Sequence, residues 1–232
     1  MKNCLWLGLA SLFILLSVKS CKVDDLQPPE VYEIDSVFRK YTAFDSLSFW
    51  IYLKTTTGDP TANRDTVRVL RTFKDKRFHS DEISPNGFYY QAIESTLSSR
   101  FTGLTKYELS VGKVFGNTSA SDNFRLFFNN GRYYRALITN TPFGQELLLG
   151  INEGNYTTVE KIPSLTLQGR VYTDVFHTKV VDYQNAPDTA YFDFWVAKNY
   201  GLIRYQLLRP QSTPPVIDNW ELVSSNLIPY TR

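Results

Sequence analysis

The sequence predicts a mainly β protein with antiparallel strands, and few or no helices after the first twenty residues. Three observations support this fold class. Aromatic residues make up 15% of the chain, with 15 Tyr and 16 Phe, and aromatic side chains are enriched in strands. Apolar residues recur at a period of two in several segments. Gly, Pro and Asn separate these segments, and no convincing helical pattern lies between them.

The N-terminus carries the pattern of an export signal. Lys2 gives a short basic region, and the run from Leu5 to Leu16 is almost wholly apolar. A helix that crosses a bilayer needs roughly 20 apolar residues, and this run is shorter. Its length suits a secretory signal peptide, with an uncleaved helical anchor as the alternative. We therefore predict a signal peptide over residues 1–20.

The residues that end this run resemble the lipobox of bacterial lipoproteins. The segment 18–21 fits the family pattern, except that Lys19 stands where a small residue is usual. The resemblance implies cleavage before Cys21 and acylation of Cys21, which anchors a protein because each buried methylene contributes about 0.8 kcal/mol. Asp24 and Asp25 resemble the acidic export tag of Bacteroidota surface lipoproteins. The expected location is the bacterial outer membrane, lipid-anchored and facing the cell exterior.

Processing simplifies the composition of the expected mature chain. Its two cysteines are Cys4, which cleavage removes, and Cys21, which acylation occupies, so no disulfide or free thiol is expected. The formal charge of +2 also disappears, because Lys2 and Lys19 are removed. A neutral chain without a basic run gives no reason to expect a nucleic-acid partner. Residues 21–30 are expected to form a lipidated tether, and residues 31–232 a single β-rich domain.

Several segments are expected to form strands. In residues 46–54, Trp50 and Tyr52 alternate with apolar residues on the other face, which predicts a strand covered on both sides. Residues 91–100 are the best helix candidate, but their assignment stays open because Thr and Ser weaken the pattern. The remaining expected strands lie within residues 66–73, 122–138, 164–181, 189–198, 201–209 and 219–228.

Asn130-Gly131 stands between two alternating runs and predicts a hairpin with a type I′ turn, in which both central residues have positive φ. The residues expected on one shared face are Phe124, Leu126 and Phe128 with Tyr134, Ala136 and Ile138.

Residues 165–178 and 191–208 resemble a strand pattern of uncharacterised Bacteroidota outer-membrane lipoproteins. The resemblance implies a strongly curved antiparallel sheet, similar to the half-barrel of periplasmic lipoprotein carriers, which hold acyl chains in their concave face. It implies no reaction. The matching residues are Gly169, Tyr172, Asp174, Val175, Trp195, Ala197, Lys198, Gly201, Leu202 and Arg204.

The sequence contains no pattern that predicts catalysis. It lacks a Gly-x-Ser-x-Gly nucleophile elbow and a phosphate-binding Gly-rich loop. The two histidines, His79 and His177, lie far apart, and the polar segment around His79 is more typical of a loop than of a metal site. We therefore expect no enzymatic activity, no cofactor and no metal.

The expected function is non-enzymatic binding. A hydrophobic or glycan ligand would lie on the concave aromatic face of the sheet, with Trp50, Tyr52, Trp195 and Tyr200 as candidate wall residues. The alternative is an envelope adaptor that docks a protein partner through its sheet surface. A ligand carrier needs an apolar cavity, whereas an adaptor needs an exposed apolar patch.

Four Asp-Ser/Thr-apolar triplets resemble the O-glycosylation sequon of exported Bacteroidota proteins. The candidate acceptors are Ser36, Ser46, Thr66 and Thr189.

Overall fold

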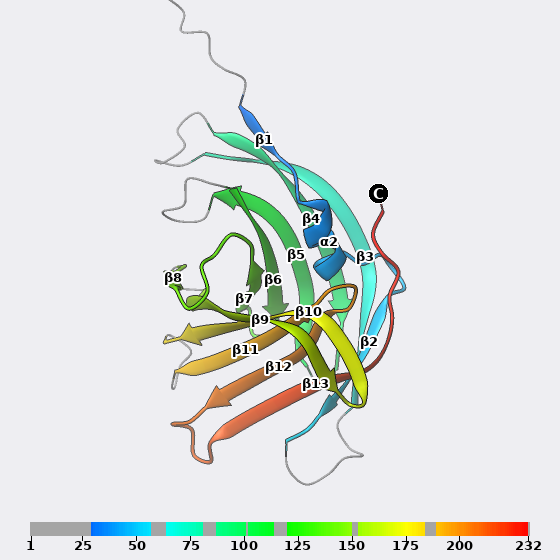
Figure 1. Cartoon of the computed structure of the whole chain (residues 1–232), viewed down its shortest axis with the longest axis vertical. Helices are drawn as coiled ribbons and strands as arrows, with labels where there is room; N and C mark the ends of the chain where they lie inside the picture. The colour runs from blue at the N-terminus through cyan, green and yellow to red at the C-terminus, as the bar shows by residue number, and fades with distance from the viewer. Residues whose placement is uncertain are drawn as a thin grey trace, which may run out of the picture. The chain divides into compact units, whose positions relative to one another are not determined.

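The fold is an antiparallel sheet in which most strands pair with their neighbours in the sequence (Figure 1). The computed structural model describes residues 29–56, 64–80, 87–100, 102–113, 120–149, 153–183 and 189–231. One short helix lies within these residues, α2 (Ser36–Thr42). The strands are β1 (Glu30–Tyr32), β2 (Phe49–Lys54), β3 (Arg64–His79), β4 (Phe88–Ser98), β5 (Leu104–Lys113), β6 (Ala120–Phe128), β7 (Tyr133–Ile138), β8 (Glu146–Leu148), β9 (Asn155–Leu167), β10 (Arg170–Asp182), β11 (Ala190–Ala197), β12 (Gly201–Arg209) and β13 (Val216–Asn226).

The strand order joins the first part of the chain to the last. It runs β7-β6-β5-β4-β3-β2-β13-β12-β11-β10-β9-β8, and β1 pairs with β4. In the β2–β13 pair, Trp50 lies opposite Ser225 and Tyr52 opposite Leu222. The predicted mainly β, antiparallel architecture with little helix is therefore confirmed.

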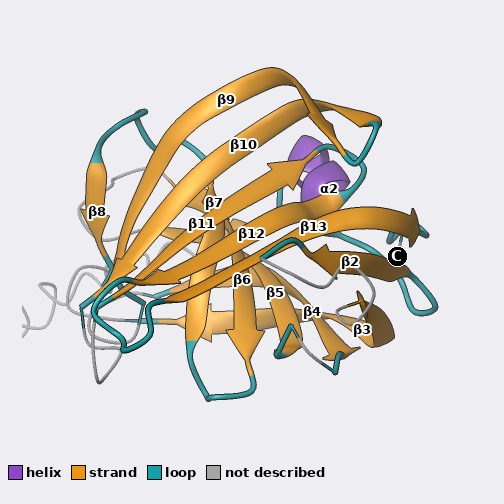
Figure 2. Cartoon of the chain, turned by 90° about the horizontal axis from the view of Figure 1, so that it is seen from below, coloured by secondary structure: helices purple, strands orange, loops and turns teal. Residues whose placement is uncertain are grey.

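The sheet has two halves, the first half-sheet (β2–β7) and the second half-sheet (β8–β13) (Figure 2). Their side chains meet in a shared aromatic core. Tyr134 of β7 packs on Phe192 of β11 with ring centroids 4.2 Å apart, and Phe128 lies 6.3 Å from Tyr205. The Tyr205 hydroxyl donates a hydrogen bond to the Thr102 carbonyl (3.2 Å). The described sheet is neither closed nor strongly curled. The expected half-barrel with an open concave face is thus replaced by two half-sheets with a filled interior.

The free edge of β7 is satisfied by side chains instead of by a further strand. Thr178 Oγ1 of β10 donates to the Ala136 carbonyl (2.8 Å), and the Ile138 amide donates to the Tyr156 hydroxyl (3.0 Å). Because unpaired backbone groups on an edge strand invite pairing with other chains, these contacts also protect the edge.

The β6–β7 hairpin has the predicted faces but a different turn. The six residues expected on one face pack toward the core. In the turn, the Gly131 amide donates to the Phe128 carbonyl (3.1 Å), and Gly131 has φ of 78° while Asn130 has no positive φ. This is a three-residue loop with a left-handed Gly, not a type I′ turn. The Asn130 side chain explains the difference, because its Oδ1 accepts from the Arg132 amide (3.0 Å) and holds the local conformation.

The short helix α2 was not predicted. Asp35 caps its N-terminus by accepting hydrogen bonds at Oδ1 from the Val37 and Phe38 amides (2.7 and 3.1 Å). Phe38 and Tyr41 are buried, and α2 contacts β11 and β12. A helix of seven residues carries less than two turns of periodic pattern, which is too little to recognise.

The undecided segment 91–100 is mostly strand. Its residues up to Ser98 belong to β4, and Ile93 and Leu97 are buried with Gln91 and Ser95. β4 pairs with β3 on one side and with β5 on the other, so tertiary pairing overrides a weak local helix preference.

Residues 31–232 belong to one compact unit, with a division after Glu30. Within the described part of the chain, no helix is long and apolar enough to cross a membrane. The predicted signal peptide, Cys21 and most of the predicted tether lie outside the described residues.

Candidate functional site

Two of the four predicted wall residues, Trp50 and Tyr52, lie against the backbone beside Tyr200, the third, and their polar side-chain atoms are used inside the protein. Trp50 Nε1 donates to the Tyr200 carbonyl (2.8 Å), and the Tyr52 hydroxyl donates to the Leu202 carbonyl (2.6 Å). Trp50 and Tyr52 are 5% and 2% exposed. Burial raises the pKa of Tyr52 well above its ordinary value, so its hydroxyl remains a donor. Both side chains join β2 to the start of β12.

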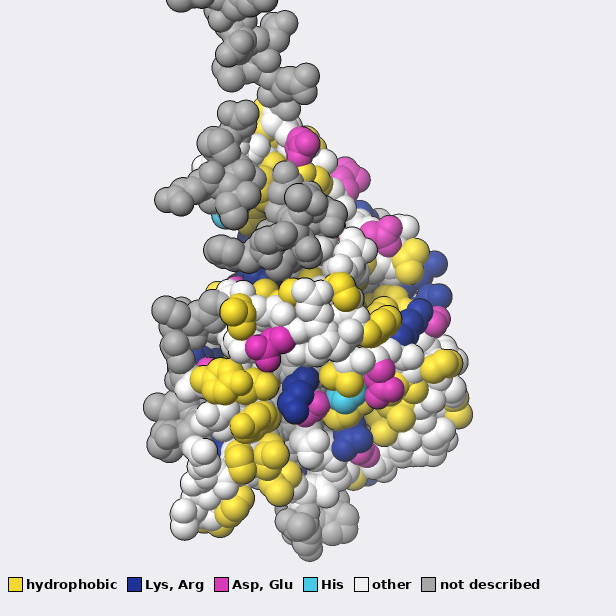
Figure 3. All heavy atoms as spheres, turned by 60° about the vertical axis from the view of Figure 1, so that its left-hand side comes forward, with side chains coloured by type: hydrophobic (Ala, Val, Ile, Leu, Met, Phe, Trp, Pro, Cys, Tyr) yellow, Lys and Arg dark blue, Asp and Glu magenta, His cyan; other side chains and the backbone are white. Residues whose placement is uncertain are grey.

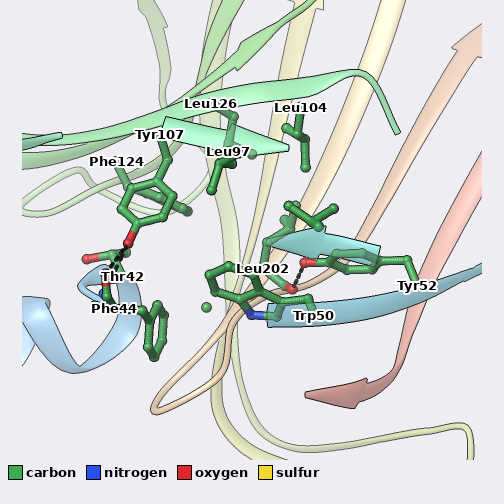
Figure 4. A pocket seen from close by; sticks show the side chains of 12 residues that line it. Thr42, Phe44, Trp50, Tyr52, Leu97, Leu104, Tyr107, Phe124, Leu126 and Leu202 are labelled. Atoms are coloured by element: carbon green, nitrogen blue, oxygen red, sulfur yellow. Dashed lines mark hydrogen bonds between the residues drawn. The ribbon is translucent and has the colours of Figure 1, made fainter. Parts of the chain in front are cut away.

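A small apolar cavity adjoins Trp50 and Tyr52 (Figure 4). Its volume is about 20 Å³, which is close to the space that one water molecule needs. Pockets that bind small molecules usually measure about 300–1,000 Å³. The cavity is therefore a packing defect of the aromatic core and is much too small for an acyl chain. Its lining residues are Thr42, Phe44, Trp50, Tyr52, Val67, Leu97, Leu104, Tyr107, Phe124, Leu126, Gly201 and Leu202.

Trp195 lies on the opposite, outer face of the second half-sheet, away from Trp50. His177 stacks on it with ring centroids 4.4 Å apart and an angle of 7° between the rings. The Arg204 guanidinium lies 4.5 Å from the Trp195 ring centroid. Cross-strand neighbours thus contact the indole from both adjacent strands, β10 and β12, and Trp195 is 9% exposed. This leaves little of the ring to stack on a sugar.

The polar ends of this stack are also paired. His177 Nε2 lies 2.8 Å from an Asp193 carboxylate oxygen, and Arg204 Nε donates to Asn219 Oδ1 (2.9 Å). Tyr200, the fourth predicted wall residue, packs edge-on against Tyr172 with centroids 5.0 Å apart. The polar groups around Trp195 therefore have partners within the sheet surface.

An apolar row crosses the outer face of the second half-sheet near the C-terminal end of β10. In the strand register each member lies directly opposite the next, from β8 to β13. The polar Asn155 of β9 lies between Leu148 and Val181. We call these residues the outer row: Leu148, Val181, Tyr191, Leu208 and Ile217.

The alternation of each strand shows that the outer row faces away from the core. Val180 and Phe192, next to row members, are buried in the core, and Leu147 and Leu207 pack against it. Within the row, Leu148 and Ile217 are 69% and 46% exposed, and the nearby Tyr183 is 63% exposed. Hydrophobic side chains gather on the face turned forward in Figure 3, interrupted by charged groups.

A line of polar residues lies beside the outer row on the same face of the sheet, two positions along each strand. Lys179, Asp193, Gln206 and Asn219 form the next cross-strand line, and Lys179 Nζ lies 5.7 Å from the Tyr191 ring centroid. An apolar centre with a polar border is the usual anatomy of a protein interface. The sequence signalled this row only indirectly, through strands such as 189–198 that carry apolar residues at both parities.

The candidate O-glycosylation acceptors lie in different environments. Ser36 is exposed at the start of α2, whereas Ser46, Thr66 and Thr189 are half-buried. Asp65, which precedes Thr66, is buried and accepts hydrogen bonds from the Arg100 and Thr102 amides (2.9 and 2.7 Å). The hydrogen bonds of Asp65 to this loop are a structural reason for an aspartate before Thr66. Asp188, which precedes Thr189, lies outside the described residues.

Among the described residues, no group of three or more His, Cys, Asp or Glu side chains is placed to hold a metal ion. Comparison of the chain with protein-family models, curated proteins and solved structures finds no match.

Proposed function

We propose that the protein is an exported, lipid-anchored, non-enzymatic adaptor of the bacterial envelope, which docks a protein partner through the outer row. The observation that carries the proposal is a continuous apolar row on the outer face, in which Leu148 and Ile217 are exposed and the other three members are half-buried. An antiparallel sheet with one face in water usually carries polar side chains on that face. Apolar area that is removed from water stabilises a complex by about 25 cal/mol per Å², so a partner that covers the row would gain from it.

A carrier of a hydrophobic molecule has less support. Such a carrier needs an internal cavity, and the cavity beside Trp50 and Tyr52 measures about 20 Å³. A glycan-binding protein is the second candidate function, and a separate surface groove favours it.

Site-specific photocrosslinking in intact cells tests the adaptor. A benzophenone amino acid at Ile217 should give one discrete protein adduct, and Tyr191→Lys in the same chain should abolish it. Thr173, which is exposed near the other end of β10, provides the matched control. A crosslinker at Thr173 should give no adduct, and Thr173→Lys should leave the Ile217 adduct unchanged. An Ile217 adduct that persists with Tyr191→Lys would sink the proposal.

The lipid anchor and the location of the protein at the cell surface have a separate test. The resemblance of segment 18–21 to a lipobox and the acidic pair after Cys21 support acylation and surface display. Cys21→Ala should leave a heavier precursor that no longer incorporates labelled palmitate. Protease added to intact cells should degrade the wild-type protein if it faces the cell exterior. Unchanged labelling of the Cys21→Ala variant would contradict acylation, and full protease resistance would contradict surface display.

A further inference from the structure

A second surface feature, independent of the outer row, is a groove that crosses β4 between β1 and β3. Its volume is about 360 Å³, within the range of small-molecule sites. One wall comes from Val31, Tyr32 and Glu33, and the other from Lys74–Lys76. Gln91 of β4, which lies opposite Lys76 in the strand register, also lines the groove. We call this feature the β4 groove.

Gln91 supplies a fixed donor. Its side chain is 6% exposed, and its Oε1 accepts a hydrogen bond from Arg39 Nη2 of α2 (3.1 Å). That bond orients the amide, and its NH₂ group has no acceptor among the described residues. A ligand oxygen that accepts from this oriented amide forms a hydrogen bond with little loss of side-chain freedom.

The walls of the β4 groove carry both donors and acceptors with no net charge. Glu33 and Asp75 are acidic, and Lys74 and Lys76 are basic. Lys76 Nζ lies 4.6 Å from the Tyr89 ring centroid. Asp75 is already paired, because its Oδ1 accepts from the Lys76 amide (2.8 Å) and its Oδ2 from Arg77 Nε (3.4 Å). A ligand with a full positive or negative charge would meet one repulsive pair. A neutral ligand rich in hydroxyl groups can bind to both Glu33 and the two lysines, because each hydroxyl both donates and accepts.

An aromatic side chain adds an apolar surface to this polar lining. Tyr32 lines the β4 groove and packs edge-on against Phe88, with ring centroids 5.3 Å apart and an interplanar angle of 83°. The contact fixes the ring at low conformational cost. Aromatic rings offer apolar area with defined geometry, and the C–H face of a sugar ring is the matching apolar part of a polyol.

We propose that the β4 groove binds a neutral oligosaccharide. Gln91 donates to a sugar hydroxyl, Glu33, Lys74 and Lys76 bind the remaining hydroxyls, and Tyr32 contacts a ring face. This site would act independently of the outer row, so the chain would hold a glycan on one surface and a protein on another.

Saturation-transfer NMR and calorimetry on the lipidated protein test this, in a detergent without a sugar headgroup. The probes are maltotriose, cellotriose, mannotriose and chitotriose at millimolar concentration, with trigalacturonate as a charged comparator. At least one neutral trisaccharide should bind, and trigalacturonate should not. Gln91→Glu keeps the acceptor for Arg39 but removes the amide donor, and it should weaken binding about tenfold.

Further variants separate binding from folding. Lys74→Gln together with Lys76→Gln changes only exposed side chains and should weaken binding without loss of structure. Tyr183→Ala, which removes an exposed tyrosine outside the groove, should leave binding unchanged. The proposal is overturned if none of the four neutral probes binds, if only the charged probe binds, or if the groove variants bind as tightly as the wild type.

Discussion

At the scale of single residues, Asp122 is a buried carboxylate with a raised pKa. It is 6% exposed, and both carboxylate oxygens lie 3.4 Å from the Asp35 amide beneath the start of α2. Burial, with a smaller contribution from the Asp35 charge, raises the pKa of Asp122 from 3.8 to about 6. The hydrogen bond from the Asp35 amide and the charge of Arg39 lower the pKa of Asp122 but do not compensate for burial.

This shift predicts how stability depends on pH. The folded state holds the Asp122 proton more tightly than the unfolded state, so protonation favours folding. The contribution is complete below about pH 4 and is lost as pH rises through about 6. Two pKa units correspond to at most about 3 kcal/mol. Asp122→Asn should therefore raise the free energy of unfolding at pH 7 and have little effect at pH 4. Urea denaturation across this range measures it, and a variant destabilised equally at both pH values would contradict the shift.

Two glycines with positive φ allow the cost of a left-handed backbone to be measured separately from the cost of a steric clash. Gly154 has φ of 71°, and an added Cβ would lie 2.7 Å from the Val181 carbonyl oxygen. Gly169 has φ of 76°, and nothing lies within 4 Å of an added Cβ. Gly169→Ala should cost roughly 1–2 kcal/mol from its left-handed backbone alone. Gly154→Ala should cost at least about 1 kcal/mol more, because the backbone must move. Equal urea midpoints for the two variants would contradict this, because they would show that the backbone at Gly154 moves away from Val181 at no cost.

At the scale of single elements, α2 depends on its cap. Asp35→Ala removes two hydrogen bonds to the first turn and should lower the free energy of unfolding by about 1 kcal/mol. Asp35→Asn retains the cap and also removes the charge that faces Asp122, so it should be nearly neutral or slightly stabilising. Chemical denaturation at pH 7 compares the two. If both variants lose the same stability, the charge of Asp35 matters more than its hydrogen bonds.

The elements also show what the sequence could predict. Where one parity of a strand is apolar, as for Phe124 and Leu126 in β6, the buried face follows directly from the pattern and was predicted correctly. Local turn chemistry was predicted less well: Asn130-Gly131 predicted a type I′ turn, but only Gly131 has positive φ. In β2 both parities are apolar, and only the structure shows that the Trp50 face is the more buried.

The candidate site was harder to predict, for a physical reason. The outer row unites residues from strands up to about seventy positions apart, such as Leu148 and Ile217, and it exists only through strand register. The pairing of β2 with β13 is likewise fixed by the whole sheet and not by any local signal. Trp195 shows the limit most clearly, because the sequence identified an aromatic residue but not that His177 and Arg204 lie against its ring.

At the scale of the whole molecule, the two half-sheets are expected to unfold together. They share one aromatic core, and polar contacts cross between them. The Tyr134 hydroxyl of β7 donates to the Asp182 carboxylate of β10 (2.8 Å), and Asp182 is 1% exposed. Arg132 Nη1 lies 3.5 Å from the same carboxylate. A buried carboxylate that loses a hydrogen-bond donor costs roughly 1–3 kcal/mol, so Tyr134→Phe should destabilise the fold by that amount.

Hydrogen exchange distinguishes cooperative unfolding from separate unfolding of the halves. In the wild type, the slowest amides of β5 and β12 should report the same free energy of opening, because neither half-sheet retains a covered core alone. Tyr134→Phe should lower both values equally, although the substitution lies in β7 and β12 is in the other half. Val171→Ala, an exposed change near the far end of β10, should leave both values almost unchanged. If Tyr134→Phe accelerates exchange in β5 while β12 keeps its protection, the halves are separate cooperative units joined only through β2 and β13.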